Sequence, residues 1–148
     1  NILKDNQNIN IAIEKSIKIK AKIVSQDEKE KGIRACLNYG HTFGHVIENE
    51  TNYNTYLHGE AVSIGIIMAN KLAIKLGFIN NNDANKIKTL LKKYNLPTTY
   101  QIKNVEDFYQ HFFLDKKQMI QILNLSCQLV LEIAKLQIKY QKMILLRY

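Results

Sequence analysis

The stretch GHTFGHVIENETNYNTYLHGEAVSIGIIMA, residues 40–69, decides the fold of this chain. Its first part predicts a helix over residues 37–50, because apolar side chains recur there at helical spacing and would form a core-facing stripe. These side chains are Phe43, Val46 and Ile47. The next segment, TNYNTYL at residues 51–57, is rich in turn-forming residues and predicts a loop.

A further helix is predicted over residues 59–76. Its segment VSIGIIMA is apolar on nearly every side, so this helix must be buried at the centre of the fold. Gly77 is a suitable stop for it, since glycine readily adopts the left-handed conformation in which many helices end.

The N-terminal segment has the pattern of one amphipathic helix over residues 5–24, with isoleucines recurring every three to four residues. The polar run at residues 25–31 would end this helix. Gly32 then permits a turn before Arg34.

The segment after Gly77 predicts two shorter helices. Asn82 or Asp83 can cap the first, which ends near Tyr94, and residues 105–112 suggest the second. Residues 118–148 contain neither glycine nor proline, and their apolar residues fit helix and strand almost equally. Propensity alone would extend a helix to about Lys135.

These patterns predict a mainly α chain that forms a single domain over residues 1–148. With 46% hydrophobic and 23% charged residues, the composition is that of a folded globular protein. No apolar run approaches the roughly 20 residues of a membrane span, and the polar start at residues 1–10 is unlike a secretory signal. We therefore expect a cytoplasmic protein without a membrane partner. The absence of an initial Met suggests a piece of a longer chain.

The net charge of +8 comes from dispersed lysines. A solvated basic surface is the first interpretation, and a modest steering field for a phosphorylated substrate is the second. A nucleic-acid partner is not expected, because no recognition motif or interleaving of aromatic and basic residues occurs. Cys36 and Cys127 lie far apart without CxxC spacing, which predicts two buried thiols rather than a zinc ribbon or a disulfide.

Three of the four histidines lie within 18 residues, at His41, His45 and His58. On a helix, the first two would share one face, and a chain reversal could bring the third back to them. Imidazole is the usual ligand of divalent zinc, and catalytic sites commonly use three protein ligands. The cluster indicates a metal site, with core or capping histidines as the alternative. Gly44 suggests a close approach of a backbone or a ligand, and simple helix packing would also explain it.

Arg34 and Asn38 lie just before the first histidine, near a predicted helix N-terminus that favours anions. The planar guanidinium of Arg34 suits phosphate or carboxylate, and the amide of Asn38 can bind a hydroxyl. A surface arginine and a helix-capping asparagine are equally open interpretations.

At residues 16–79 the chain closely resembles the C-terminal domain of the 3-dehydroquinate synthase family, most densely in LNYGHTFGHVIE followed by LHGEAV. The resemblance continues thinly through NLP at 95–97 and FLDKK at 113–117. It implies the helical C-terminal domain of a dehydroquinate synthase-like fold, with room for a small β-hairpin after residue 117. The family's N-terminal α/β NAD-binding domain has no counterpart in this sequence.

The resemblance also implies roles for the site residues. His41 and His58 would be two ligands of a divalent zinc, or of another metal such as cobalt, while His45 would make hydrogen bonds and transfer protons at the substrate. The residues that would hold the phosphate, carboxylate or hydroxyl groups of the substrate are Lys20, Arg34, Asn38 and Lys116, with Lys117 as the alternative to the last. Of these, Lys20 and Arg34 would join His45 in catalysis. Glu60 fits a helix-start carboxylate better than a metal ligand.

The reaction that the resemblance implies is a lyase step of the shikimate pathway, in aromatic amino acid biosynthesis. A phosphorylated seven-carbon keto acid, 3-deoxy-arabino-heptulosonate 7-phosphate, is oxidised transiently by NAD, loses phosphate, is reduced again and closes to 3-dehydroquinate. The full-length enzyme would be a homodimer. The third zinc ligand, a glutamate, would lie in the missing half, and the family places neither His111 nor Glu48 to replace it.

Other functions stay open beside this one. Related sugar-phosphate cyclases and metal-dependent polyol dehydrogenases share the architecture, although the two histidine motifs favour dehydroquinate synthase. A different possibility is a degenerate, non-catalytic remnant or a helical domain that binds a partner chain, since the isolated fragment would lack activity. The poor resemblance of residues 119–131, and Ala134 at the place of a family glycine, add weight to that alternative.

Overall fold

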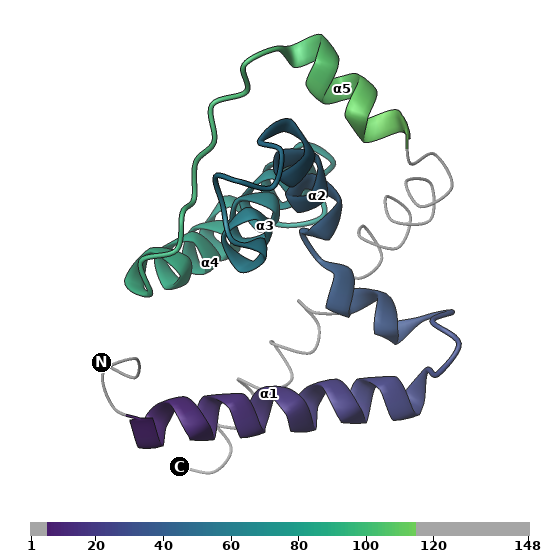
Figure 1. Ribbon diagram of the computed structural model, residues 1–148. Coiled ribbons are helices and arrows are strands. Elements are labelled where there is room, and N and C mark those ends of the chain that lie inside the picture. The colour runs from purple at the N-terminus through teal and green to yellow at the C-terminus, as the bar shows by residue number, and fades with distance from the viewer. Residues whose placement is uncertain (1–5, 115–148) are drawn as a thin grey trace. The chain divides into compact units, whose positions relative to one another are not determined.

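The structure is a computed structural model that describes residues 6–114, and every regular element in that range is a helix (Figure 1). The elements are α1 (Asn6–Gln26), η2 (Ile33–Asn38), α2 (His41–Glu50), α3 (His58–Lys75), α4 (Asn81–Lys93) and α5 (Val105–Leu114), with η2 a 3-10 helix. The mainly α class is thereby confirmed. The predicted β-hairpin after residue 117, the helix to Lys135, and Cys127 fall outside the described residues.

The chain divides into two compact units, Asn1–Leu37 and Asn38–Tyr148. The expectation of a single domain over residues 1–148 stays a prediction. In the first unit, α1 confirms the helix predicted over residues 5–24, and its isoleucines remain largely exposed. Four of them are 42–62% exposed, namely Ile11, Ile13, Ile17 and Ile19.

The chain leaves α1 through a turn that Asp27 organises. The Asp27 carboxylate accepts hydrogen bonds from the backbone N–H groups of Lys31 (2.8 Å), Gly32 (2.7 Å) and Arg34 (3.0 Å). The predicted turn before Arg34 is present, and its left-handed residue is Glu30, with φ 52°.

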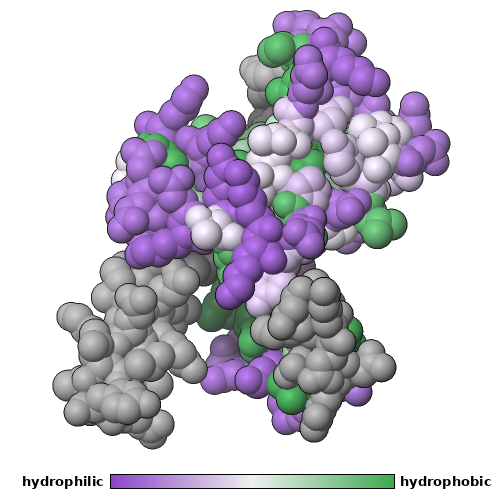
Figure 2. Space-filling model, turned by 90° about the vertical axis from the view of Figure 1, so that its left-hand side faces the viewer, coloured by the Kyte–Doolittle hydropathy of each residue, from purple (hydrophilic) through white to green (hydrophobic). Residues whose placement is uncertain are grey.

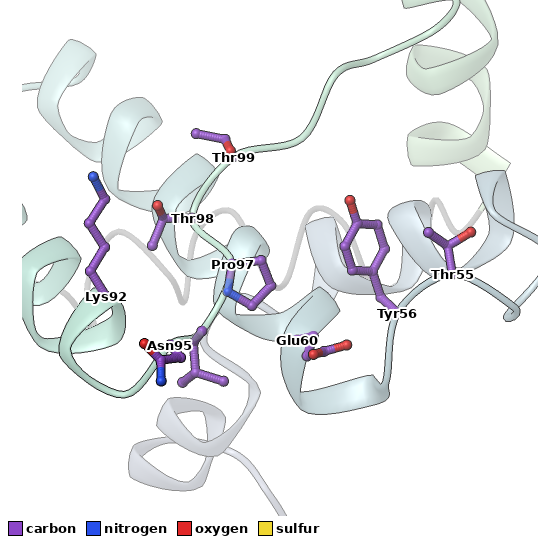
Figure 3. Close-up of a pocket in the computed structure, with 9 residues that line it drawn as sticks. Thr55, Tyr56, Glu60, Lys92, Asn95, Pro97, Thr98 and Thr99 are labelled. Carbon is purple, nitrogen blue, oxygen red and sulfur yellow. The ribbon is translucent and has the colours of Figure 1, made fainter. Parts of the chain in front are cut away.

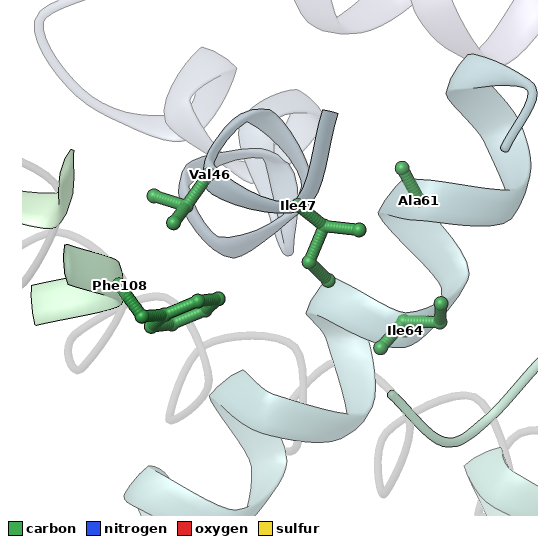
Figure 4. Close-up of a cluster of buried hydrophobic side chains, with 5 residues drawn as sticks. All are labelled: Val46, Ile47, Ala61, Ile64 and Phe108. Atoms are coloured by element: carbon green, nitrogen blue, oxygen red, sulfur yellow. The ribbon is translucent and has the colours of Figure 1, made fainter. Parts of the chain in front are cut away.

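In the second unit, α2 and α3 pack against each other and form the core. Val46 and Ile47 of α2 meet Ala61 and Ile64 of α3, and Phe108 of α5 closes the cluster (Figure 4). This confirms the predicted apolar stripe of α2 and the central burial of α3. Removing such side chains from water is the main stabilising contribution to the unit.

The helix predicted over residues 37–50 is wrong at its start, because η2 ends at Asn38 and α2 begins only at His41. Gly40 separates them with φ +82°, and a Cβ there would lie 2.6 Å from Ile66 Cγ1 and 2.7 Å from Ile66 N. The contact with α3 thus demands glycine and a left-handed backbone, which break the helix. Local spacing carries no information about that contact.

The remaining helices follow the prediction with one correction. The N-cap of α4 is Asn80, whose side chain accepts a hydrogen bond from the N–H of Asp83 at 2.9 Å, and neither Asn82 nor Asp83 takes that place. Asn80 is the first of three consecutive asparagines, so sequence alone could not select among them. The end of α4 at Lys93, the short helix α5 and the end of α3 before Gly77 are confirmed.

Hydrophilic residues predominate on the face shown in Figure 2, with hydrophobic residues scattered among them. No helix among residues 6–114 combines the length and the apolar content needed to cross a bilayer.

Candidate functional site

Three imidazoles converge where α2 and α3 begin. The ring centroids lie 5.8 Å apart for His41 and His45, 5.3 Å for His41 and His58, and 5.7 Å for His45 and His58. The first two rings come from successive turns of α2, and the loop at residues 51–57 returns the third as the first residue of α3. The predicted cluster is therefore present, and its rings are close enough for two imidazoles to reach one metal ion.

Close packing of α2 on α3 holds these rings together. A Cβ on Gly44 would lie 3.2 Å from both Cα and N of Val62, so even alanine would require the facing backbone to shift by a few tenths of an ångström. Gly44 thus serves close backbone approach between helices, which was one of the two explanations that its position allowed. The positions of the three imidazoles depend on that approach.

Glu48 joins two of the three histidines. Its carboxylate Oε2 lies 2.8 Å from Nδ1 of His45, and its Oε1 lies 2.9 Å from Nδ1 of His58. The residue is only 5% exposed, whereas the side chains of His45 and His58 are 54% and 56% exposed. One buried carboxylate therefore spans two solvent-facing imidazoles from different helices.

The electrostatics of the cluster follow from burial and from these contacts. Burial raises the pKa of the Glu48 carboxyl, but the hydrogen bonds to His58 and His45 outweigh it, so the net pKa lies below the usual range. Burial lowers the pKa of His41 below its ordinary value, and the neighbouring imidazoles act in the same direction. At neutral pH, Glu48 is ionised and His41 is neutral, which is the form that binds a metal.

One group of side chains in the cluster offers donors of the kind that divalent cations accept, and it contains His58 but not His41. His45, Glu48 and His58 each offer one ligand atom, and these three atoms lie within 4.8 Å of one another. In addition, Nδ1 of His41 is buried and has no hydrogen-bond partner among the described residues. Imidazole nitrogens with a carboxylate oxygen are ligands that zinc and other divalent metals accept.

The predicted substrate-binding residues that the structure describes are divided between the two compact units. Lys20, exposed on α1, and Arg34 belong to the first compact unit, while Asn38 ends η2 at the start of the second. The guanidinium of Arg34 donates to the backbone carbonyl of Glu28 at 2.7 Å and lies 3.8 Å from the carboxylate of Glu30. Lys116 and its alternative Lys117 fall outside the described residues.

Glu60 has the helix-start role expected for it. Its Oε2 accepts a hydrogen bond from the N–H of Leu57 at 2.9 Å, immediately before α3. It also lines an open pocket of about 590 Å³ with Tyr56, Lys92 and Thr98 (Figure 3), which includes none of the three clustered histidines. His111 is exposed on α5.

The sequence analysis gives Glu48 no role, beyond the expectation that it does not replace the missing metal ligand. The available signal was its position three residues after His45, a spacing that places both side chains on one helix face. The contact with His58 depends on the path of the loop and had no local signal.

Comparison with known proteins supports the resemblance seen in the histidine motifs. A family model described as "3-dehydroquinate synthase C-terminal" matches residues 1–118. The chain is 60% identical over 117 residues to a protein named 3-dehydroquinate synthase from Nitratiruptor sp., covering 79% of this chain and 34% of the relative.

Two further relatives carry the same name. The Sulfurovum sp. protein is 62% identical over 115 residues, which is 78% of this chain and 33% of the relative. The Sulfurimonas denitrificans protein is 64% identical over 106 residues, which is 72% of this chain and 30% of the relative. The chain thus spans about a third of the length of the curated relatives that it matches.

Proposed function

The chain belongs to the 3-dehydroquinate synthase C-terminal family, and we therefore propose that it forms the metal- and substrate-binding part of a 3-dehydroquinate synthase. The complete enzyme would convert 3-deoxy-arabino-heptulosonate 7-phosphate to 3-dehydroquinate and phosphate. The observation that carries the proposal is the convergence of three imidazoles, with ring centroids 5.3–5.8 Å apart, at the start of two helices.

In this proposal His41 and His58 hold a divalent metal, zinc or cobalt, and a third ligand comes from the N-terminal part of the enzyme. The lowered pKa of His41 supports the assignment, because a neutral imidazole can donate its lone pair. When bound, the metal would polarise the substrate hydroxyl that NAD oxidises.

His45 acts on the substrate itself. Its side chain is 54% exposed beside the two proposed ligands, so a bound substrate can reach it for hydrogen bonding and proton transfer. Lys20, Arg34 and Asn38, together with Lys116, bind the charged and hydroxyl groups of the substrate. Anchoring these groups would fix the orientation of the substrate for the reaction.

The NAD site and the third metal ligand of the proposed enzyme would lie outside this chain. NAD is bound mainly by an N-terminal domain, and the chain spans only about a third of its relatives. The complete enzyme is a cytoplasmic homodimer in this proposal.

A non-catalytic remnant, or a helical domain that binds a partner chain, is the second candidate. The observation in its favour is that the Arg34 guanidinium already donates a hydrogen bond to the backbone of its own loop, at 2.7 Å to the carbonyl of Glu28. Part of the donor capacity of this side chain is therefore used within the loop, and a phosphate or carboxylate would bind to its other N–H groups or replace that contact.

A chimera distinguishes the two candidates. The N-terminal two-thirds of the Nitratiruptor sp. protein would be joined to this chain in place of the segment to which it is 60% identical. With zinc and NAD, we expect the chimera to release phosphate from the heptulosonate phosphate, while the 148-residue chain alone releases none. A folded, zinc-loaded chimera without phosphate release would favour the remnant. Phosphate release by the chain alone would contradict the proposed division of the site.

A further inference from the structure

We propose that Glu48 is a positioning residue whose single buried carboxylate holds both His45 and His58 as the Nδ1–H tautomer and leaves Nε2 of each free to act. The tasks of the two Nε2 atoms rest on the proposed function, metal binding for His58 and proton transfer for His45. The tautomers themselves follow from contacts within the chain.

The contacts are paired and specific. Each carboxylate oxygen of Glu48 meets one Nδ1 atom, Oε2 with His45 at 2.8 Å and Oε1 with His58 at 2.9 Å. Both distances are those of charge-assisted hydrogen bonds. Glu48 is 5% exposed, so its position is set by packing, while the two imidazoles reach outward from it.

The chemistry of the carboxylate then decides the tautomers. An ionised carboxylate can only accept hydrogen bonds, so each Nδ1 atom must carry the proton that it donates. A neutral imidazole has one N–H, and Nε2 therefore keeps its lone pair. A lone pair at Nε2 is needed to ligate a metal or to take up a proton, and a hydrogen bond at the other nitrogen fixes the ring orientation.

Direct ligation by Glu48 fits the distances less well. Ligand atoms around a tetrahedral zinc with bonds of about 2.0–2.1 Å lie about 3.3 Å apart. The observed separations of 2.8 and 2.9 Å are shorter and match donor–acceptor pairs. A purely structural role is the other alternative, because the carboxylate also ties α2 to the first residue of α3.

Replacing Glu48 by Gln distinguishes between two roles of this residue, namely fixing the tautomers of His45 and His58 and linking α2 to α3. The carboxamide has nearly the same shape and can still bridge both rings, but it offers one acceptor oxygen and one donor NH₂ group. One of the two imidazoles must then accept at Nδ1 and become the Nε2–H tautomer. The matched control is Glu50→Gln, which removes the same charge from the same helix at a carboxylate that accepts from the Tyr100 hydroxyl at 2.5 Å.

The measurement is nitrogen-15 NMR of the histidine side chains in the metal-free 148-residue chain, in mildly alkaline solution, with circular dichroism to verify folding. We expect both His45 and His58 to be Nδ1–H in the parent chain and in Glu50→Gln. In Glu48→Gln, one of the two should switch to Nε2–H. If His58 switches, the affinity for zinc should fall about 10- to 100-fold, the range typical of lost hydrogen bonds to metal ligands.

An Nε2–H tautomer at His45 or His58 in the parent chain would overturn the proposal, and this readout needs no variant to fold. Two unchanged Nδ1–H tautomers in a folded Glu48→Gln chain would also overturn it. If the tautomers behave as expected but the chimera binds no zinc, the positioning role of Glu48 stands and the proposed metal function fails.

Discussion

Gly65 of α3 lies against the backbone of Gly40 so closely that a Cβ on Gly65 would be 2.1 Å from the carbonyl oxygen of Gly40. The same Cβ would lie 2.8 Å from the backbone nitrogen of Gly44. Both neighbours are backbone atoms at the start of α2, which cannot move aside as a flexible side chain would. The start of α2, which carries His41 and His45, is thus positioned by a glycine on the facing helix.

Replacing Gly65 by Ala should therefore destabilise the second unit by about 3 kcal/mol or more, at the upper end of the range for overpacked cores. Chemical denaturation followed by circular dichroism measures the change. Gly59→Ala is the matched control, because a Cβ there meets nothing within 4 Å. Since alanine favours helices over glycine by about 0.5–1 kcal/mol, this control should be neutral or slightly stabilising. Equal effects of the two substitutions would contradict the packing argument.

Substitutions of the three histidines should have different effects in the chimeric enzyme, because their proposed roles differ. His41→Ala and His58→Ala each remove a proposed ligand, so zinc content and turnover should fall together. His45→Ala should retain zinc while turnover falls roughly 10²- to 10⁴-fold, as expected for the loss of a general acid or base. Metal analysis alongside phosphate release provides both readouts. Loss of zinc from His45→Ala with retention in His41→Ala would reverse the assignment.

Asp27 should make the turn after α1 sensitive to acid. The hydrogen bond from the Lys31 backbone, followed by that from Arg34, holds the pKa of this carboxyl below its ordinary value of 3.8. A group whose pKa is lowered by folding stabilises the structure above the unfolded value, and that stabilisation disappears as the pH falls through the folded value. Protection of the backbone amides of Lys31 and Gly32 from hydrogen exchange should therefore decline below about pH 4.

Asp27→Asn tests this dependence, because the carboxamide does not titrate and has one acceptor oxygen instead of two. The variant should show weaker protection of these amides at neutral pH and little further loss in acid. Amide exchange followed by NMR compares the two chains, with the intrinsic pH dependence of exchange removed. An unchanged acid dependence in Asp27→Asn would assign the effect to another group.

Ser63 should stabilise the segment that follows α4. Its hydroxyl, on a residue only 2% exposed, donates to the carbonyl oxygen of Pro97 at 2.8 Å. Ser63→Ala leaves that carbonyl without this donor, so we expect a loss of about 1–2 kcal/mol in the free energy of unfolding. Ser16→Ala is the control, since its hydroxyl donates within the exposed helix α1 and its loss should change stability by less than about 0.5 kcal/mol.

Elements with strong periodicity and clear ends were predictable from sequence. The helices over residues 6–26 and 58–75 agree with the prediction because each carries a sustained apolar pattern and a nearby stop signal. Within residues 37–50, periodicity continues through a break that it cannot detect. The left-handed Gly40 between η2 and α2 reflects a contact with Ile66, 26 positions later in the chain.

The candidate site, like the fold, was predictable from the sequence only in part. The sequence by itself determined that His41 and His45 would share one helix face, and it allowed His58 to return to them through one short loop, which the structure bears out. It could not determine that Glu48 would bridge His45 and His58. That contact needs the left-handed backbone of Asn52 and Tyr53 in the loop and the glycine packing of α2 on α3. Tertiary structure decided it, because a hydrogen bond between two helices depends on their distance and angle, which no local pattern encodes.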